Sequence, residues 1–231
     1  LNLSGLVNKT LSLSLDDLRS RQKFEVDAGF ECGGNSPRLY HGLIGNARWG
    51  GVRLVDLLEE AGLDRDGIEV VFYGADKGME RTRSDVDFDV EQSFGRSMHI
   101  DDAENPDIIL AYEMNGEPLP LFHGAPLRLV VPGWYGVANV KWLNQIHVQD
   151  SRYMGRFMGR DYVTLSKRDI GGEERWEERS VTRIQLKSSI IRVTENGNNH
   201  NIMGFVLNDG TPLRSVEISI DGGAWQQAEM D

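Results

Sequence analysis

The stretch of residues 30–52 has the sequence FECGGNSPRLYHGLIGNARWGGV and contains Cys32, the only cysteine of the chain. An apolar run that includes Phe24 and Val26 leads into this stretch, and turn-forming residues follow the cysteine directly. The pattern predicts that Cys32 lies at a strand end, where the chain enters a glycine loop. Glycines let a ligand approach a thiolate closely, which suits chemistry at sulfur. A lone cysteine is also typical of a small buried apolar residue, so both interpretations stay open here.

Composition excludes several classes of protein. A single cysteine rules out an internal disulfide and any zinc or iron–sulfur site built from several thiolates. The net charge of −11 argues against nucleic acid as a partner, because phosphate binding needs a basic surface. No stretch approaches the roughly 18 consecutive apolar residues that cross a bilayer, so we expect a soluble protein without a membrane span. The chain starts at Leu1 and not at Met, so we expect an upstream segment, and the compartment stays open between periplasm and cytoplasm.

Short helices and hairpins predict an α+β fold for the first part of the chain. Ser14 and the acidic residues after it are typical of a capped short helix. Apolar residues at helical spacing over 54–58, with Gly62 as a stop, predict a second helix. Strands are expected over 68–73, 108–114, 127–131 and 140–148, with a hairpin turn at Asn115 and Gly116.

A change in composition predicts the domain boundary. We expect a first domain over 1–170 with mixed sheets and short helices, then a charged, glycine-containing linker over 171–181. Residues 182–231 contain short strands separated by turns, but too few strands to close two sheets. This part is expected to be an incomplete, immunoglobulin-like β-sandwich.

Several motifs in a fixed order together resemble one known family. They are Cys32 to Asn35, the run GNARW over 45–49 with Gly51 and Val52, the run LAYEMNG over 110–116, His123 with Arg128, the run VKWL over 140–143, and Asp161 with Tyr162. This series is similar to the molybdenum-pterin domain of the sulfite oxidase family. Ser97 and Met98 stand where animal enzymes have a Tyr-Gly-Ala-Ser run, so a bacterial branch of the family is expected.

The resemblance implies a metal site and a cofactor site. In the family, one molybdenum atom is held by the dithiolene of one molybdopterin and by a cysteine thiolate, and Cys32 matches that ligand. Thiolate is a soft ligand that suits a metal cycling between oxidation states. The pterin ends in a phosphate, which cations would bind. Taken one by one, Arg128 and Lys141 are more typical of charged strand residues that face water, and the resemblance reverses that interpretation. The implied cofactor-binding positions are Cys32, Asn35, Asp76, His123, Arg128, Asn139, Val140 and Lys141.

The resemblance also implies catalytic residues, with one departure. Tyr162 matches the family's active-site tyrosine, whose phenol can steady an oxyanion, although a surface aromatic at the domain edge is the alternative. The family's substrate arginine, five residues after the cysteine, is replaced by Pro37. Arg38, one position later, is the local candidate for a catalytic cation.

The implied activity is oxidation of sulfite to sulfate by oxygen-atom transfer at molybdenum. Reduction of nitrate or another oxyanion or oxide by a related enzyme is the first alternative, and a metal-free binding module on the same scaffold is the second. The given sequence contains no Cys-x-x-Cys-His haem motif, so electrons are expected to pass to a separate acceptor, such as a cytochrome c, or to a domain outside this sequence. Dimerisation through the sandwich domain is a further expectation that the resemblance implies.

Overall fold

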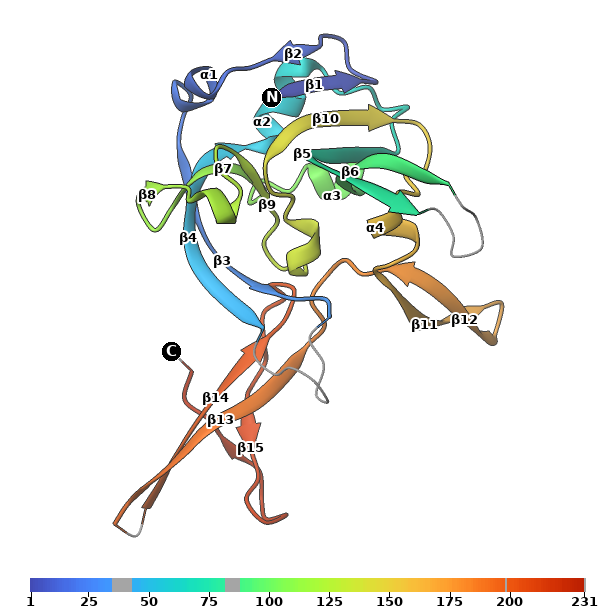
Figure 1. Cartoon of the computed structure of the whole chain (residues 1–231). Helices are drawn as coiled ribbons and strands as arrows, with labels where there is room; N and C mark the ends of the chain where they lie inside the picture. The colour runs from blue at the N-terminus through green and yellow to red at the C-terminus, as the bar shows by residue number, and fades with distance from the viewer. Residues whose placement is uncertain (35–42, 82–87, 198, 231) are drawn as a thin grey trace. The chain divides into compact units, whose positions relative to one another are not determined.

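Two units make up the chain, Leu1–Ile184 and Gln185–Asp231. The structure, a computed structural model, describes residues 1–34, 43–81, 88–197 and 199–230 (Figure 1). Asn35, Pro37 and Arg38 lie outside the described residues. The other residues expected at the site all belong to the first unit, so its two sheets are described first.

The first sheet has the strand order β2-β1-β10-β5-β6. Only the pair of β1 with β10 is parallel, and the other neighbours are antiparallel. Strand β5, which pairs with β10 and β6, is almost wholly buried in its first half, as expected for an apolar β-branched run between two partners. The strands are β1 (Asn2–Gly5), β2 (Leu11–Ser12), β5 (Glu69–Arg81), β6 (Asp89–His99) and β10 (Leu143–Gln149).

The second sheet has the order β3-β4-β7-β8, and β9 also pairs with β7. The long strands β3 and β4 form a curved hairpin (Figure 1). Cys32 follows β3 directly, at the end of the hairpin where the chain passes from β3 to β4. The Asn115–Gly116 turn between β7 and β8 has φ values of 54° and 80°, which confirms the predicted hairpin. The strands are β3 (Phe24–Glu31), β4 (Ile44–Arg53), β7 (Ile109–Met114), β8 (Glu117–Pro118) and β9 (Arg128–Val130).

Short helices cover the sheets, and the two predicted helices are present. Ser14 caps α1 (Leu15–Arg19) through a reciprocal capping box with Asp17. Helix α2 (Leu54–Ala61) ends at Gly62 in the left-handed conformation and buries an apolar face against the first sheet and its neighbours. The remaining helical elements are α3 (Ile100–Ala103), α4 (Arg156–Gly159), η1 (Leu121–His123) and η2 (Gly136–Ala138). This combination of mixed sheets and few helices confirms the α+β class. None of the described helices has the length and apolar character needed to cross a membrane.

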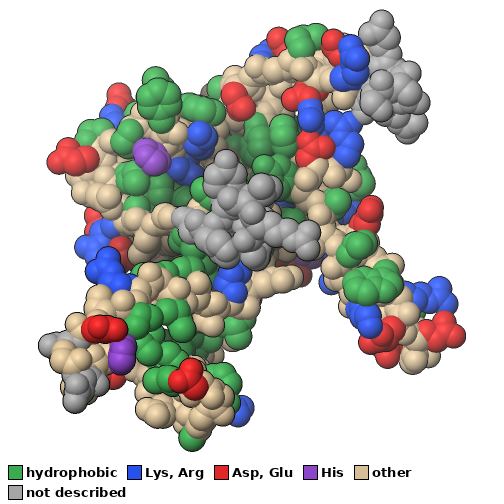
Figure 2. Space-filling view, turned by 60° about the horizontal axis from the view of Figure 1, so that its bottom comes forward, with side chains coloured by type: hydrophobic (Ala, Val, Ile, Leu, Met, Phe, Trp, Pro, Cys, Tyr) green, Lys and Arg blue, Asp and Glu red, His purple; other side chains and the backbone are tan. Residues whose placement is uncertain are grey.

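The stretch 171–181, expected to be a linker, contains an ordered strand. Strand β11 (Val163–Ile170) turns at Gly171 and Gly172 and pairs along its whole length with β12 (Glu173–Ser180). The charged residues that suggest a linker pair across the hairpin, for example Lys167 with Glu174 at 2.5 Å. Such cross-strand pairs stabilise a solvated sheet without an apolar core. The charged and apolar side chains of this hairpin project at the lower right of Figure 2.

The second unit contains two separate two-stranded ladders. Strand β13 (Lys187–Asn196) pairs with β14 (Asn199–Leu207), and β15 (Glu217–Ile218) pairs with β16 (Gln226–Gln227). The immunoglobulin-like sandwich and its role in dimerisation stay predictions. Many large apolar side chains of this unit are 50% to 69% exposed, namely Leu186, Ile190, Ile191, Val193, Met203, Ile220, Trp225 and Met230.

Candidate active site

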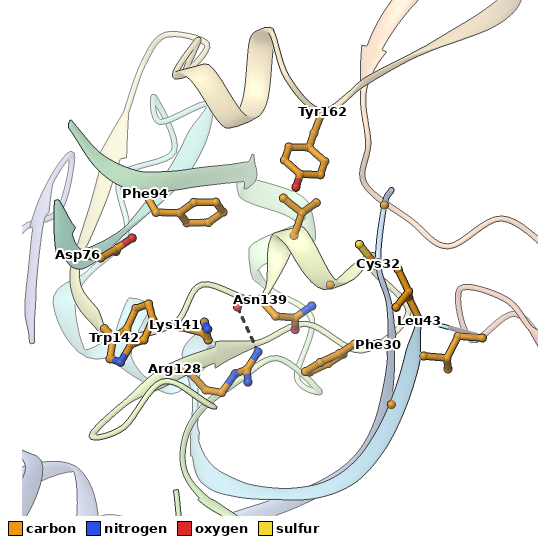
Figure 3. A pocket seen from close by; sticks show the side chains of 15 residues that line it. Phe30, Cys32, Leu43, Asp76, Phe94, Arg128, Asn139, Lys141, Trp142 and Tyr162 are labelled. Carbon is orange, nitrogen blue, oxygen red and sulfur yellow. Dashed lines mark hydrogen bonds between the residues drawn. The ribbon is translucent and has the colours of Figure 1, made fainter. Parts of the chain in front are cut away.

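A cavity of about 610 Å³ lies in the first unit, where residues of β3, β4 and β9 of the second sheet face residues of β5 and β6 of the first (Figure 3). Its polar lining includes most of the described residues expected at the site. Its walls are apolar and aromatic, and they come from Phe30, Leu43, Phe94, Val137 and Trp142. The expected residues that line the cavity are Cys32, Asp76, Arg128, Asn139, Lys141 and Tyr162.

Cys32 lies at one end of the cavity. Its backbone N–H donates to the Leu43 carbonyl at 3.0 Å, which continues the β3–β4 ladder by one step and fixes the start of the glycine turn. Its side chain is exposed, and the sulfur points into the cavity in Figure 3. Among the described residues, no group of three or more His, Cys, Asp or Glu side chains could hold a metal ion. The Cys32 sulfur is therefore available to a ligand that occupies the cavity.

Tyr162 faces the same end from the opposite wall. It lies between α4 and β11, and its carbonyl accepts a hydrogen bond from the Val181 N–H at 2.8 Å. Its hydroxyl points into the cavity in Figure 3. A Cβ atom added to Gly33 would lie 3.4 Å from the Tyr162 ring, so the turn after Cys32 packs directly beside the phenol. The structure thus brings Cys32 and Tyr162 together.

Arg128 begins β9 at the floor of the cavity and is 5% exposed. Its Nη1 donates to the His123 carbonyl at 2.8 Å and its Nη2 to the Asn139 carbonyl at 3.2 Å. The guanidinium also lies over the Trp49 ring, 4.6 Å from the centroid. Its Nε has no partner among the described residues. Burial lowers the pKa of Arg128 to about 10, so the group keeps its proton at neutral pH.

The polar groups of Asn139 and Val140 form hydrogen bonds with neighbouring residues of the protein. The Asn139 side chain accepts from the Val131 N–H at 2.6 Å and donates to the Tyr135 carbonyl at 3.2 Å. Val140 is fully buried, and its N–H and carbonyl bond to Ala138 and Leu129. Asn139 lines the cavity and Val140 does not. Their expected contacts with a cofactor stay predictions.

Lys141, Trp142 and Asp76 form the end of the cavity farthest from Cys32 in Figure 3. The ammonium of Lys141 donates to the Phe122 carbonyl at 3.1 Å and lies 4.4 Å from the centroid of the Trp142 ring. Asp76 is exposed and lies on β5, where the pairing with β6 shifts register. Gly74 suits this position, because a Cβ atom would lie only 2.9 Å from the Lys141 carbonyl oxygen. This end therefore carries one cation and one anion beside an aromatic ring.

His123 lies outside the lining of the cavity. Its side chain is exposed, whereas its backbone carbonyl accepts from Arg128. The apolar walls, by contrast, were missed by sequence reasoning. Phe94 and Val137 carry no motif of their own, and a strand pattern does not indicate which cavity a side chain lines. Trp142 lies inside the VKWL motif, so the resemblance contained a signal for it.

Comparisons with known proteins identify the family of the chain. The model of the oxidoreductase molybdopterin-binding domain matches residues 1–157. Mitochondrial sulfite oxidase of Mus musculus is 33% identical over 96% of this chain and 43% of that protein. The chain belongs to the sulfite oxidase family. The crystal structure of the sulfane dehydrogenase SoxCD from Paracoccus pantotrophus superposes with a TM-score of 0.76 and 29% identity, over 99% of this chain and 58% of that one.

The chain is also similar to an enzyme that is named for nitrate. Nitrate reductase [NADH] of Ulva prolifera is 28% identical over 65% of this chain and 18% of that protein. The chain spans less than half the length of the mouse sulfite oxidase and of this nitrate reductase.

The residues of the cavity fit the molybdenum-pterin cofactor of the sulfite oxidase family. A soft thiolate, Cys32, lies at one end without a cluster of hard ligands among the described residues. A buried guanidinium with an unpartnered Nε lines the floor, as expected where an anionic group binds. Phe30 and Trp142 offer flat apolar surfaces for a ring. The cavity therefore offers a soft ligand, ring contacts and cations in one connected space.

Proposed function

We propose that the chain is the catalytic part of a molybdenum oxidoreductase that oxidises sulfite to sulfate. The observation that carries the proposal is the layout of one cavity. Cys32 and Tyr162 face one end, while Arg128 and Lys141 lie away from them. A metal ligand and a phenol are needed where oxygen transfer occurs, and cations are needed where a phosphate binds.

Cys32 would bind the metal, and Arg128 and Lys141 would bind the phosphate of the pterin. Asp76 would accept hydrogen bonds from the pterin ring, and His123, Asn139 and Val140 would complete the binding set together with Asn35. When bound, the molybdenum-pterin group supplies oxygen-atom transfer coupled to the uptake of two electrons. The protein's part is to orient the reactants and to balance charge.

Tyr162 would donate a hydrogen bond from its hydroxyl to an oxygen of the substrate. A donor that is already oriented stabilises developing negative charge without reorganisation during the reaction. The Val181 bond to the Tyr162 carbonyl and the packing against Gly33 hold the phenol beside the thiolate. Arg38 is proposed as the cation that attracts the sulfite dianion, because the acidic chain as a whole would repel it.

Steady-state oxidation of sulfite with ferricyanide as the electron acceptor tests this proposal. We expect sulfite-dependent reduction of ferricyanide by protein loaded with molybdenum and pterin, and none by the loaded Cys32→Ser variant. Loaded wild-type protein that does not reduce ferricyanide in the presence of sulfite would contradict the proposal.

Reduction of nitrate or another oxyanion or oxide is the second candidate. The nitrate reductase relative and Pro37 at the position of the family's substrate arginine favour it. This candidate would be favoured if chemically reduced protein converts nitrate to nitrite faster than oxidised protein oxidises sulfite. A folded chain that takes up neither molybdenum nor pterin would point to a binding module.

The electrons are proposed to pass to a separate protein, such as a cytochrome c, and the neighbour SoxCD supports a partner of this kind. A homodimer formed through the second unit is proposed in addition. Reduction of cytochrome c by sulfite and loaded protein tests the first proposal, and sedimentation velocity tests the second. No transfer to cytochrome c with full transfer to ferricyanide would contradict the choice of acceptor.

A further inference from the structure

Arg96, in the middle of β6, is a charged residue that the proposed function does not use. Its side chain is 1% exposed, so the guanidinium is removed from water. Its two terminal nitrogens donate to the backbone carbonyls of Phe157 and Val181. Burial lowers the pKa of Arg96 to about 10, which leaves it protonated at neutral pH. A buried charge is costly unless it is well hydrogen-bonded, so these two bonds matter for the local structure.

The two carbonyls belong to segments on either side of Tyr162. Phe157 lies in α4, a few residues before the tyrosine, and its ring contacts the Tyr162 ring at a centroid distance of 6.4 Å. Val181 follows β12, and its N–H donates to the Tyr162 carbonyl at 2.8 Å. The bonds of Arg96 therefore tie both neighbours of Tyr162 to the first sheet.

The same contacts reach the turn that carries Cys32. A Cβ atom added to Gly33 would lie 3.4 Å from the Tyr162 ring and 3.5 Å from the Val181 side chain. The glycine turn thus packs against the two residues whose backbones are bonded to each other. A shift of Val181 would move the surface on which both Tyr162 and Gly33 rest.

Other contacts hold α4 and the hairpin without Arg96. The Ser180 hydroxyl donates to the Met158 carbonyl at 2.7 Å, and the Arg156 Nε donates to the Asp161 carboxylate. These bonds do not involve Val181. Removal of Arg96 is therefore expected to loosen the Val181–Tyr162 pair more than it loosens the unit as a whole.

We propose that Arg96 is a positioning residue that holds the Tyr162 phenol beside Cys32 by binding the carbonyls of Phe157 and Val181. The planar guanidinium suits this role, because its fixed fork of donors can bind two acceptors in one geometry. The inference rests on the proposed role of Tyr162 in the reaction, and its test separates the two.

A double-mutant cycle on cofactor-loaded protein tests the coupling. We expect Arg96→Met to lower kcat/KM for sulfite by roughly 10-fold to 30-fold in the parent chain, but by less than about 2-fold in the Tyr162→Phe background. Arg96→Lys keeps a charge and can bind one carbonyl, so it should lose only about 3-fold to 10-fold. If Arg96→Met does not fold, the double-mutant cycle is measured with Arg96→Lys in its place.

Glu69→Gln is the matched control. Glu69 is 2% exposed on the neighbouring strand β5, where it accepts from Ser97 and from the Tyr153 N–H. Its replacement also removes a buried charge from the first sheet. We expect it to leave kcat/KM within about 2-fold of the parent value, while it lowers the melting temperature.

Amide hydrogen exchange of cofactor-free protein gives a readout that needs neither sulfite nor the metal. We expect the Val181 amide to exchange at least about 10-fold faster in Arg96→Met, with the amides of β5 and β10 unchanged. Unchanged exchange at Val181, or an equal loss of kcat/KM in both backgrounds, would overturn the inference. If Tyr162→Phe is fully active, the proposed role of Tyr162 fails and the inference falls with it. If Tyr162→Phe is impaired and Arg96→Met is not, only the role of Arg96 fails.

Discussion

The floor of the cavity and the end that carries Cys32 are built in different ways. Arg128 and Asn139, at the floor, are buried, and the side chain of each is bonded to two backbone groups. Cys32 is exposed and Tyr162 is half-buried, and both are held through their main chains. The floor is therefore rigid at its side chains, whereas the Cys32 end presents side-chain atoms that can form new bonds on a fixed backbone.

We interpret this difference as a division between residues that bind the cofactor and residues that take part in the reaction. In the proposed function, the residues that bind the phosphate are fixed donors that do not move during turnover. Burial strengthens their electrostatic attraction to the phosphate. The Cys32 end needs a thiolate and a hydroxyl with capacity for new bonds, and it needs access for substrate. Substitutions in the two regions should therefore change different measured quantities.

The largest effect is expected at Cys32. Cys32→Ser should abolish sulfite oxidation and leave pterin content within about 2-fold of the parent, because Arg128 and Lys141 are untouched. Turnover with ferricyanide and pterin content by fluorescence after release measure the two quantities. Activity close to that of the parent would remove Cys32 from the metal site.

Arg128→Met should weaken cofactor binding and leave turnover nearly unchanged. Loss of a charge-assisted contact of roughly 2 to 3 kcal/mol predicts cofactor binding about 100-fold weaker. The protein that remains loaded should turn over at nearly the parent rate. Titration of the cofactor-free protein with pterin cofactor checks this, and Arg152→Met, which removes a surface arginine far from Arg128 in the chain, is the control. Unchanged affinity would show that the unpartnered Nε does not face the cofactor.

Tyr162→Phe should lower kcat/KM by about 10-fold to 100-fold, the usual effect of one lost hydrogen bond in a transition state. Cofactor content should stay the same, because the ring and its packing against Gly33 are kept. Kinetics on samples normalised to molybdenum content measure the effect. A loss of cofactor without a loss of rate would indicate that Tyr162 binds the cofactor and does not take part in the reaction.

Lys141→Gln should have the smallest effect. Its ammonium is partly exposed and bonded to the Phe122 carbonyl, so water and salt weaken its attraction to a phosphate. We expect cofactor affinity to fall by about 5-fold to 10-fold, and the difference from the parent to shrink in 1 M salt. An effect larger than that of Arg128→Met would reverse the assignment of the principal phosphate ligand.

Local patterns in the sequence predicted several elements of the fold. The capped start at Ser14, the stop at Gly62 and the turn at Asn115 depend on residues that are close in the chain, and all three are present. The hairpin over 163–180 was not predicted, because its stability comes from ion pairs between strands and not from an apolar pattern.

The candidate site was predicted through a resemblance rather than from local patterns. The order of the motifs along the chain placed Cys32, Arg128 and Lys141 in one predicted site. All three residues line the cavity. The sequence could not show that Asn139 bonds its amide to Val131 and Tyr135, or that His123 uses its carbonyl. These roles depend on loop geometry, which motifs do not encode.

X-ray absorption at the molybdenum edge tests the central claim most directly. The spectrum of loaded parent protein should require one more sulfur neighbour than that of loaded Cys32→Ser, at equal molybdenum and pterin content. An equal number of sulfur neighbours in the two proteins would show that Cys32 does not bind the metal, and it would contradict the account of the Cys32 end.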